Sequence, residues 1–514
     1  MYSPITVLGA LGKRLVVLMR YAFIAALVLA LSGAPAAAQG SVSTYLPLVG
    51  RNQPGVVNDP QWVSPFGIVM YGSVSDSAGL QRMQEAGARW VVTGFHWAKV
   101  EPTEGARNWA TYDAQFLAAK QAGMDVAVLV MNVPVWARNG CNSGGCPDMN
   151  AEALADFLAA AAERYDGDGK DDAPGNPVVK YWTLFAEPDY CGVLVGETCT
   201  VRPGYGEEFK GLWGFNGAQY ASMLAAARTA IKGAAPNALV MNGGAAFDWF
   251  VQPWYGLPTG PYDRTFLADV IKNGGVLDML AVHYYPITMG DWGQKLDELY
   301  LTGAERGVEQ QMRALPVISP EMGYWSSGKY SDEPQQARRL VQMFVRGLAS
   351  GIQRLAWFAV FDGSPEHPTE AHGLFRASSL GLSYANAKPA YWAYRTMTTA
   401  LHGFRYHSVY YSEPGALLSQ WDHEAYEFRR AADGARMLVA WANSGEQVNP
   451  DGTSDMVIPG GHVTLASHLS LNAANPNVLA LVEVQDGGPG DADGQANGLV
   501  KLRIGTDPVY IFLP

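Results

Sequence analysis

Short apolar segments alternate with amphipathic segments along most of the chain. The apolar segments have the length and composition of buried strands. Strands are predicted at 66–71, 90–95, 125–131, 178–185, 238–242, 277–284, 317–319 and 354–361. The segments between them carry apolar residues every three or four positions, which is typical of helices packed on a core. Helices are predicted at 77–86, 108–122, 151–165, 218–233, 263–273, 296–315, 334–349 and 389–401.

Eight successive strand-then-helix units predict an α/β fold, a parallel (β/α)₈ or TIM barrel over residues 65–402. An open, doubly wound sheet is the alternative. A nucleotide-binding sheet of that kind carries a Gly-rich phosphate loop after its first strand, and this chain has none there.

The pattern changes after about residue 403, where helical periodicity stops and short alternating segments are separated by turns rich in Gly, Asn and Asp. Strands are predicted there at 425–429, 435–441, 478–484, 499–504 and 509–512. Residues 403–514 are therefore predicted to form an all-β module, a sandwich.

The first 38 residues have the pattern of a signal peptide. An apolar run, 21–31, precedes the small residues Ala36, Ala37 and Ala38, which fit a cleavage site before Gln39. The cations before that run are Lys13, Arg14 and Arg20. A start at Met19 and an uncleaved anchor are the alternatives. The run is too short for a membrane span, and no later stretch could cross a bilayer, so we expect a secreted or cell-surface protein. Residues 39–64 are expected to be a linker or surface arm.

The expected export favours disulfides between the cysteines, because disulfides persist in oxidising compartments. The four fall into two local pairs inside Gly-rich loops, and no His lies near them at a metal-ligand spacing. Of the three possible connectivities, the local one, Cys141–Cys146 and Cys191–Cys199, is predicted.

Composition limits the classes of molecule that the protein is expected to bind. The formal net charge is -12, which argues against nucleic acid and gives no attraction to anionic membranes. Charged residues make up only 16% of the chain and aromatic residues 11%. Most of these rings are expected in the core, but such a content also suits a cleft that presents flat apolar faces. The oligomeric state cannot be deduced from these numbers.

Two predicted strands end in a glutamate. The fourth is followed by Glu187, Pro188 and Asp189, and the seventh leads into Glu321. Pro188 cannot donate to a sheet, so pairing should stop there and leave Glu187 at the rim. In a barrel the carboxyl ends of all strands share one face. Two carboxyl groups on that face are what acid/base and nucleophilic chemistry at a glycosidic bond requires.

Other polar and aromatic residues fall at the same strand ends. The candidate substrate-binding residues are His96, Trp97, Asn132, Trp136, His283, Tyr285 and Trp357. Tyr284 and Tyr285 alternate in direction, so one of them is expected in the core. Trp357 is a candidate floor for a sugar ring, with pure packing as the alternative. Glu101 is expected to be structural.

Residues 65–402 resemble the retaining glycoside hydrolases of clan A, most closely those of family 39 or family 5. The matching pieces are Trp97–Pro102, Trp182–Asp189, His283–Tyr285 and Pro320–Tyr324, and a β-sandwich ending in Asp507–Phe512 also resembles family 39. The resemblance implies a carbohydrate substrate, Glu187 as general acid/base and Glu321 as nucleophile. The mechanism that the resemblance implies needs no cofactor for catalysis. Tyr285 would orient Glu321, and His283 would contact the substrate or Glu187.

This mechanism sets two physical requirements. Glu187 must hold a proton, so its pKa is expected to be raised, and Glu321 must be ionised. For retention the two carboxyl groups should lie about 5–5.5 Å apart.

The chain departs from the family at two positions. Clan A enzymes usually carry Asn before the acid/base, where this chain has Ala186, and an Arg on the second strand, where it has Val92. Asn132 and Asn242 are candidate replacements. A glycan-binding protein that has lost efficient catalysis on the same scaffold is therefore the alternative function. An adhesion protein is a third, disfavoured because no repeats or C-terminal anchor are visible.

A separate acidic segment precedes the fourth strand. Asp166, Asp168 and Asp172 alternate with glycines as in the first half of a calcium loop. The expected twelfth-position Glu is replaced by Pro177. A structural calcium site is one interpretation, and a solvated acidic turn is the other.

Overall fold

The structure is a computed structural model that describes residues 64–139, 149–190, 193–195, 198–200, 213, 217–247, 262–286, 292–327, 331–363, 371–410, 422–443, 451–471 and 478–514. The predicted signal peptide 1–38 and nearly all of the predicted linker 39–64 lie outside these residues. Among the described residues, no helix combines the length and the apolar character needed to cross a membrane.

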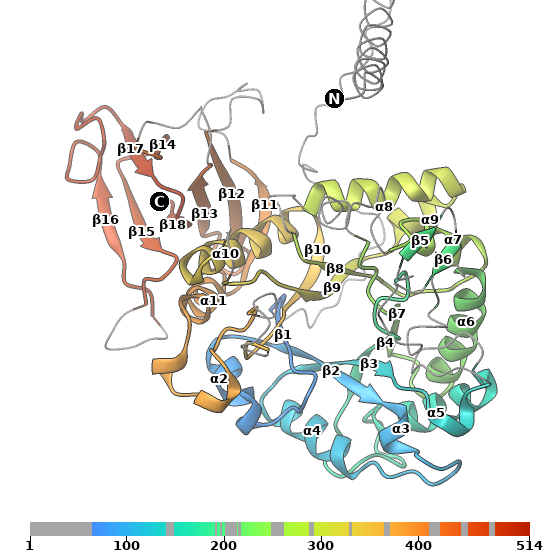
Figure 1. The fold of residues 1–514 in the computed structure, drawn as a ribbon. Coiled ribbons are helices and arrows are strands. Elements are labelled where there is room, and N and C mark those ends of the chain that lie inside the picture. Colours follow the sequence, from blue (N-terminus) through green and yellow to red (C-terminus); the bar gives the residue numbers. More distant parts are fainter. Residues whose placement is uncertain are drawn as a thin grey trace, which may run out of the picture. The chain divides into compact units, whose positions relative to one another are not determined.

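Eight parallel strands form the barrel (Figure 1). In chain order they are β1 (Phe66–Val69), β2 (Trp90–His96), β3 (Asp125–Met131), β4 (Val179–Leu184), β7 (Leu239–Asn242), β8 (Leu280–Tyr284), β9 (Val317–Met322) and β10 (Ile352–Trp357). Each strand pairs with the next in this order except β7 with β8, which end the sheet, and β10 returns to β1. Main-chain bridges Met241–Met279 and Ala245–Val282 join the β7 and β8 segments. The predicted TIM barrel is therefore confirmed.

Helices surround these strands in Figure 1. They are α2 (Leu80–Glu85), α3 (Trp97–Val100), α4 (Ala110–Gln121), α5 (Ala151–Arg164), α6 (Gly217–Ala234), α7 (Phe266–Lys272), α8 (Trp292–Arg306), α9 (Glu309–Ala314), α10 (Glu333–Ala349) and α11 (Pro389–Ala400). Local chemistry fixes several ends. The Asn150 side chain accepts from the first turn of α5, and Asp332 does so for α10. The helix predicted at 296–315 is interrupted by Gly307, whose φ of 77° ends α8.

The barrel interior follows from the alternation of side chains along each strand. Inward-facing residues form a packed cluster of Val69, Trp90, Val92, Ala127, Tyr181, Met241, Met279, Ala281, Ile318 and Ala356. The same alternation continues toward the carboxyl ends, where Tyr71 and Phe358 pack at the edge of this cluster. The mouth of the barrel is therefore floored by apolar side chains.

The C-terminal module has an antiparallel six-stranded sheet and a two-stranded ribbon. The sheet contains β11 (Phe404–Val409), β12 (His423–Arg430), β13 (Arg436–Ala442), β18 (Val509–Phe512), β15 (His462–Ser467) and β16 (Val482–Gln485). The ribbon pairs β14 (Ser454–Pro459) with β17 (Leu499–Ile504). The predicted sandwich is confirmed, although β11, β14 and β15 had not been predicted.

Both faces of the large sheet are covered. Leu438 and Ile511 pack with Met456 and Leu502 of the ribbon in one core, while residues on the other face, such as Tyr426, belong to the barrel's core. Across that second contact, Arg346 of α10 and the buried Glu424 of β12 make two hydrogen bonds of 2.9 and 2.5 Å. A buried ion pair needs good geometry to offset desolvation, and here the guanidinium is bidentate.

Candidate active site

Glu187 stands on a sharply turned segment just after β4. Phe185 and Glu187 both have left-handed backbone, with φ of 57° and 45°. Main-chain N–H of Glu187 donates to the carbonyl of Gly243 at 3.0 Å. A Cβ on Gly243 would come within 1.5 Å of the Phe185 carbonyl oxygen, so only glycine permits this turn. Non-glycine residues held in this region are uncommon and collect at functional sites.

The Glu187 carboxyl group, 28% exposed, has partners from two later segments. Tyr262 donates its hydroxyl to Oε2 at 2.9 Å, and His283 Nδ1 lies 3.1 Å from Oε1. His283 is the last inward-facing residue of β8, and its Nε2 fits against Gly244, where a Cβ would come within 2.0 Å. The predicted contact between His283 and the acid/base candidate is therefore present.

Glu321 lies on β9 and accepts two tyrosine hydroxyl groups. Tyr285 donates to Oε1 at 2.5 Å, and Tyr71, two residues beyond β1, donates to Oε2. Burial and the Glu321 charge raise the pKa of both tyrosines well above their ordinary value, so both remain donors. Tyr284 is in the core, as the alternation predicted.

The two glutamates face each other across a short gap. One carboxylate oxygen of Glu187, one of Glu321 and one ring nitrogen of His283 all lie within 4.8 Å of one another. This is close to the separation in retaining glycosidases and well short of the ~6.5–9.5 Å that leaves room for an attacking water in inverting ones. Each oxygen of both carboxyl groups already accepts a hydrogen bond, which fits acid/base chemistry better than metal binding.

The Glu187–His283 pair departs from the expected electrostatics. Burial raises the pKa of Glu187, but hydrogen bonds from His283 and Tyr262 and the charge of Lys295 outweigh it, so its pKa is lowered. Burial lowers the pKa of His283, yet the neighbouring carboxylates outweigh it and its pKa is raised. The expectation of a raised pKa for Glu187 is thus wrong for the protein without substrate, because an imidazole competes for the proton.

Asp189 is a second buried carboxyl group beside this pair. Main-chain N–H groups of Ala246 and Phe247 donate to its Oδ2 at 2.9 and 2.7 Å. Burial is the largest cause that raises the pKa of Asp189 to about 7. The Phe247 carbonyl in turn accepts from the buried Lys295 at 2.8 Å. Asp189 therefore fixes the segment after β7 rather than facing the opening.

Among the predicted substrate-binding residues, His96 and Asn132 lie at the rim. Asn132 is exposed, has a φ of 59°, and its amide nitrogen lies 2.6 Å from His96 Nδ1. Ala186 is exposed as well, at the end of the neighbouring strand β4. Asn242 is buried, and both ends of its amide bind the main chain of Ala281, so it is not free to replace a substrate contact.

The three predicted tryptophans each have a structural partner, and only for Trp136 does the substrate-binding role stay a prediction. Trp97 and Trp357 are 1% and 0% exposed, so neither presents a face to a sugar, and their burial argues against the predicted role. Trp97 donates to Glu101 at 2.9 Å, and the half-buried Trp136 donates to the Glu101 carbonyl at 3.0 Å. Glu101 is structural, as expected. The Trp357 indole donates to the His372 carbonyl at 2.9 Å.

The acidic segment lies between α5 and β4, at the barrel end opposite the glutamates. One oxygen from each of Asp166, Asp168 and Asp172 lies within 4.8 Å of the others. The loop's own N–H groups already donate to these carboxylates, for example Gly169 to Asp172 at 2.6 Å. This donor set suits a self-contained acidic turn, and calcium binding stays a prediction.

The disulfide predictions fall largely outside the described residues. Cys141, Cys146 and Cys191 are not described, and Cys199 lies in the short strand β6 (Thr198–Thr200), of which only the backbone is described. β6 pairs with β5 (Val193–Val195) in a small antiparallel ribbon. Both disulfides therefore stay predictions.

Sequence reasoning missed two residues that contact the glutamates, Tyr71 and Tyr262. Tyr71 ends the segment predicted as the first strand, and the alternation from Val69 would have turned it inward. The sequence just before Tyr262 has no periodic pattern of apolar residues, so no signal in the sequence pointed to it.

No family model and no curated protein matches the chain. Solved structures do. A family 39 glycoside hydrolase from the gut symbiont Bacteroides cellulosilyticus WH2 matches with a TM-score of 0.58 at 16% identity, over 88% of this chain and 81% of that one. A glucosidase from Croceicoccus marinus matches with a TM-score of 0.55 at 14% identity, over 87% of this chain and 94% of that one.

A family 30 endoxylanase from Clostridium papyrosolvens C71 matches with a TM-score of 0.50 at 12% identity, over 88% of this chain and 96% of that one. At these identities the likeness concerns architecture, and it covers both the barrel and the β module. The chain therefore has the fold of the clan A glycoside hydrolases of families 39 and 30.

Proposed function

We propose that this protein is a retaining glycoside hydrolase that cleaves O-glycosidic bonds of an oligo- or polysaccharide. The observation that carries the proposal is the pair Glu187 and Glu321, with carboxylate oxygens within 4.8 Å at the carboxyl ends of the barrel strands. The structural neighbours include glycosidases of two families, which supports the same class of reaction.

In the first step Glu321 attacks the anomeric carbon while Glu187 gives its proton to the glycosidic oxygen, whose bond to that carbon breaks. In the second step Glu187 takes a proton from water, the water oxygen attacks the same carbon, and Glu321 leaves as the carboxylate. Tyr71 and Tyr285 stabilise the Glu321 charge and hold its orientation.

Glu187 must be protonated for the first step, and His283 is the group that can supply that proton. The pKa directions of the free protein favour the charged pair, with the proton on His283 Nδ1. A bound sugar excludes water from the gap, which disfavours separated charges and favours the neutral pair. The 3.1 Å contact then passes the proton to Glu187 Oε1.

The test is hydrolysis of a panel of aryl glycosides and oligosaccharides, with the first-formed anomer read by ¹H NMR. Glu187→Gln and Glu321→Gln should each lose activity by at least about 100-fold, while Glu104→Gln, at an exposed position after α3, should keep it. Azide should restore turnover to Glu187→Ala, because a small anion replaces the missing base. An inverted first product would refute the retaining mechanism.

A glycan-binding protein without efficient catalysis is the second candidate. Val92 is buried inside the barrel and Ala186 is exposed beside Glu187, so neither supplies the polar contact usual in clan A. This candidate predicts that the wild-type protein and Glu321→Gln bind the same glycans equally and that neither turns them over.

Export is proposed from the N-terminal sequence, with its cations, apolar run and small residues before Gln39. Finding the mature N-terminus at Gln39 in the culture medium or periplasm of the native host would support it. A full-length chain in the cytosol would contradict it.

A further inference from the structure

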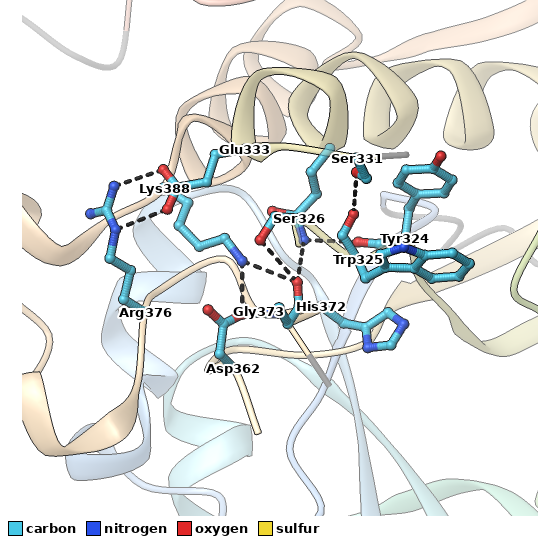
Figure 2. A network of polar contacts seen from close by, with 12 residues as sticks. Tyr324, Trp325, Ser326, Ser331, Glu333, Asp362, His372, Gly373, Arg376 and Lys388 are labelled. Atoms are coloured by element: carbon cyan, nitrogen blue, oxygen red, sulfur yellow. Dashed lines mark hydrogen bonds and ion pairs between the residues drawn. The ribbon is translucent and has the colours of Figure 1, made fainter. Parts of the chain in front are cut away.

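The loops after β9 and β10 are tied together by polar contacts that involve neither Glu187 nor Glu321 (Figure 2). The carbonyl oxygen of Ala371 accepts from Ser326 N–H at 2.9 Å, Gln336 Nε2 at 3.2 Å and Lys388 Nζ at 3.2 Å. The Lys388 side chain is 0% exposed and pairs with Asp362 at 2.7 Å. A buried lysine is rare unless paired, and a satisfied polar network fixes the segments it joins.

The network holds two aromatic residues by their main chain. The Tyr324 carbonyl accepts from Gln336 at 2.8 Å, and the Trp325 carbonyl accepts from Ser331 at 2.6 Å. The two rings stack nearly in parallel, with centroids 5.1 Å apart and an interplanar angle of 5°. Tyr324 is buried, whereas Trp325 is partly exposed, so the indole is a flat surface backed by another ring.

His372 connects this surface to the catalytic glutamate. Its ring meets Trp325 edge to face at 6.0 Å and Tyr285 at 5.3 Å, and Tyr285 donates to Glu321. Its carbonyl is fixed by the Trp357 indole. Within the described part of the chain, His372 Nδ1 is buried and has no hydrogen-bond partner. Burial and the Lys388 charge lower the pKa of His372 to about 4, so the ring is neutral near pH 7 and can both donate and accept.

We propose that Trp325 and His372 form a second sugar-binding subsite next to the reacting centre. The partly exposed indole receives the apolar C–H face of a neighbouring pyranose ring, and His372 packs between the indole and Tyr285 and so fixes the indole beside the reacting centre. The subsite rests on the proposed function, because the sugar it binds is part of the chain whose bond is cleaved. It makes the substrate an oligo- or polysaccharide rather than a simple monosaccharide glycoside.

Two readouts test this subsite separately from the chemistry. Calorimetry in a Glu187→Gln background measures binding of cello-, xylo-, manno- and chito-oligosaccharides of two to six units. The rate at which 2-deoxy-2-fluoro aryl glycosides label Glu321 measures the reactivity of the catalytic pair without the subsite, because these compounds carry one sugar. This readout is taken in variants that keep the native Glu187. Trp325→Ala and Trp325→Phe are compared with Trp392→Ala, a partly exposed tryptophan of α11 that packs on Tyr391.

Trp325→Ala should lower the affinity for the tightest-binding oligosaccharide by about tenfold or more. Trp325→Phe should lower it by less, and Trp392→Ala should leave it unchanged. The rate of Glu321 labelling should change by less than about threefold in each, which also shows that the variants fold. Unchanged oligosaccharide affinity in Trp325→Ala would overturn the subsite. So would labelling of Glu321 in a protein that binds none of the oligosaccharides. Trp325-dependent binding without any labelling would support the subsite and overturn the glycosidase proposal.

Discussion

Replacing Tyr71 with phenylalanine removes one of the two hydroxyl groups that donate to Glu321. The ring, which packs beside Phe358 at a centroid distance of 6.0 Å, stays in place. A hydrogen bond to a charged group contributes about 1.5–3 kcal/mol, and about 1.4 kcal/mol corresponds to a tenfold change in rate. The full loss is therefore roughly 10- to 150-fold.

The loss should not fall equally on the two steps. In glycosylation Glu321 begins as the carboxylate, so removing the donor destabilises the starting state as well as the transition state, and the effects partly cancel. In deglycosylation the charge returns to Glu321 as it leaves, so the donor is needed most in the transition state. Tyr71→Phe should therefore slow deglycosylation more and let the glycosyl-enzyme accumulate.

Pre-steady-state kinetics with a dinitrophenyl glycoside separates these steps, because a burst of dinitrophenol reports the first and the later rate reports the second. Reactivation of the 2-fluoroglycosyl-enzyme gives a second measure of deglycosylation. Tyr394→Phe is the control, since Tyr394 is buried and donates to the Gly67 carbonyl at 3.1 Å, away from both glutamates. Equal slowing of both steps, or an unchanged reactivation rate, would refute the reasoning.

Three further predictions concern the site's surroundings and the fold. Gly244→Ala should displace His283, because the new Cβ would come within 2.0 Å of His283 Nε2 and because Gly244 has a φ of 82°. Turnover should fall at least about tenfold, and an unchanged rate would contradict this contact. The pKa of Asp189, about 7, exceeds its unfolded value of about 3.9, so the folded state binds more protons between pH 3.9 and 7 and the unfolding free energy falls as pH rises through that range. The melting temperature of Asp189→Asn should lack this pH dependence, and melting temperatures that fall in parallel for both proteins would contradict it. Arg346→Met should lower the unfolding free energy by about 3–5 kcal/mol by leaving Glu424 unpaired, whereas Arg346→Met with Glu424→Leu should recover much of it; equal losses would contradict an ion-pair origin.

The barrel could be predicted because each of its strands is a short apolar segment followed by an amphipathic one. The positions of Glu187 and Glu321 followed from the same regularity, since strand ends share one face. In the module β11, β14 and β15 were missed. β14 and β15 are six residues each and mix polar with apolar side chains, and Gly460 and Gly461 between them join strands of different sheets and not a hairpin.

The environment of the glutamates was harder to predict, because it depends on residues distant in the chain. Trp357 was a candidate floor, but Ala356 and Phe358 on either side of it join the cluster inside the barrel, whereas Trp357 packs in the core outside it and donates to the distant His372 carbonyl. The pKa of Glu187 was expected to rise with burial, but His283 and Tyr262, 96 and 75 residues away, reverse the direction. Periodicity predicts which face a residue occupies, and not which partner meets it there.

The central claim is that Glu321 attacks the anomeric carbon, and mass spectrometry of the protein treated with 2-deoxy-2-fluoro glycosides tests it most directly. The account predicts one fluoroglycosyl group per chain, on the peptide that contains Glu321, and no label in Glu321→Gln. Label on another residue, or hydrolysis of the parent glycoside with no label from its fluoro analogue, would contradict it.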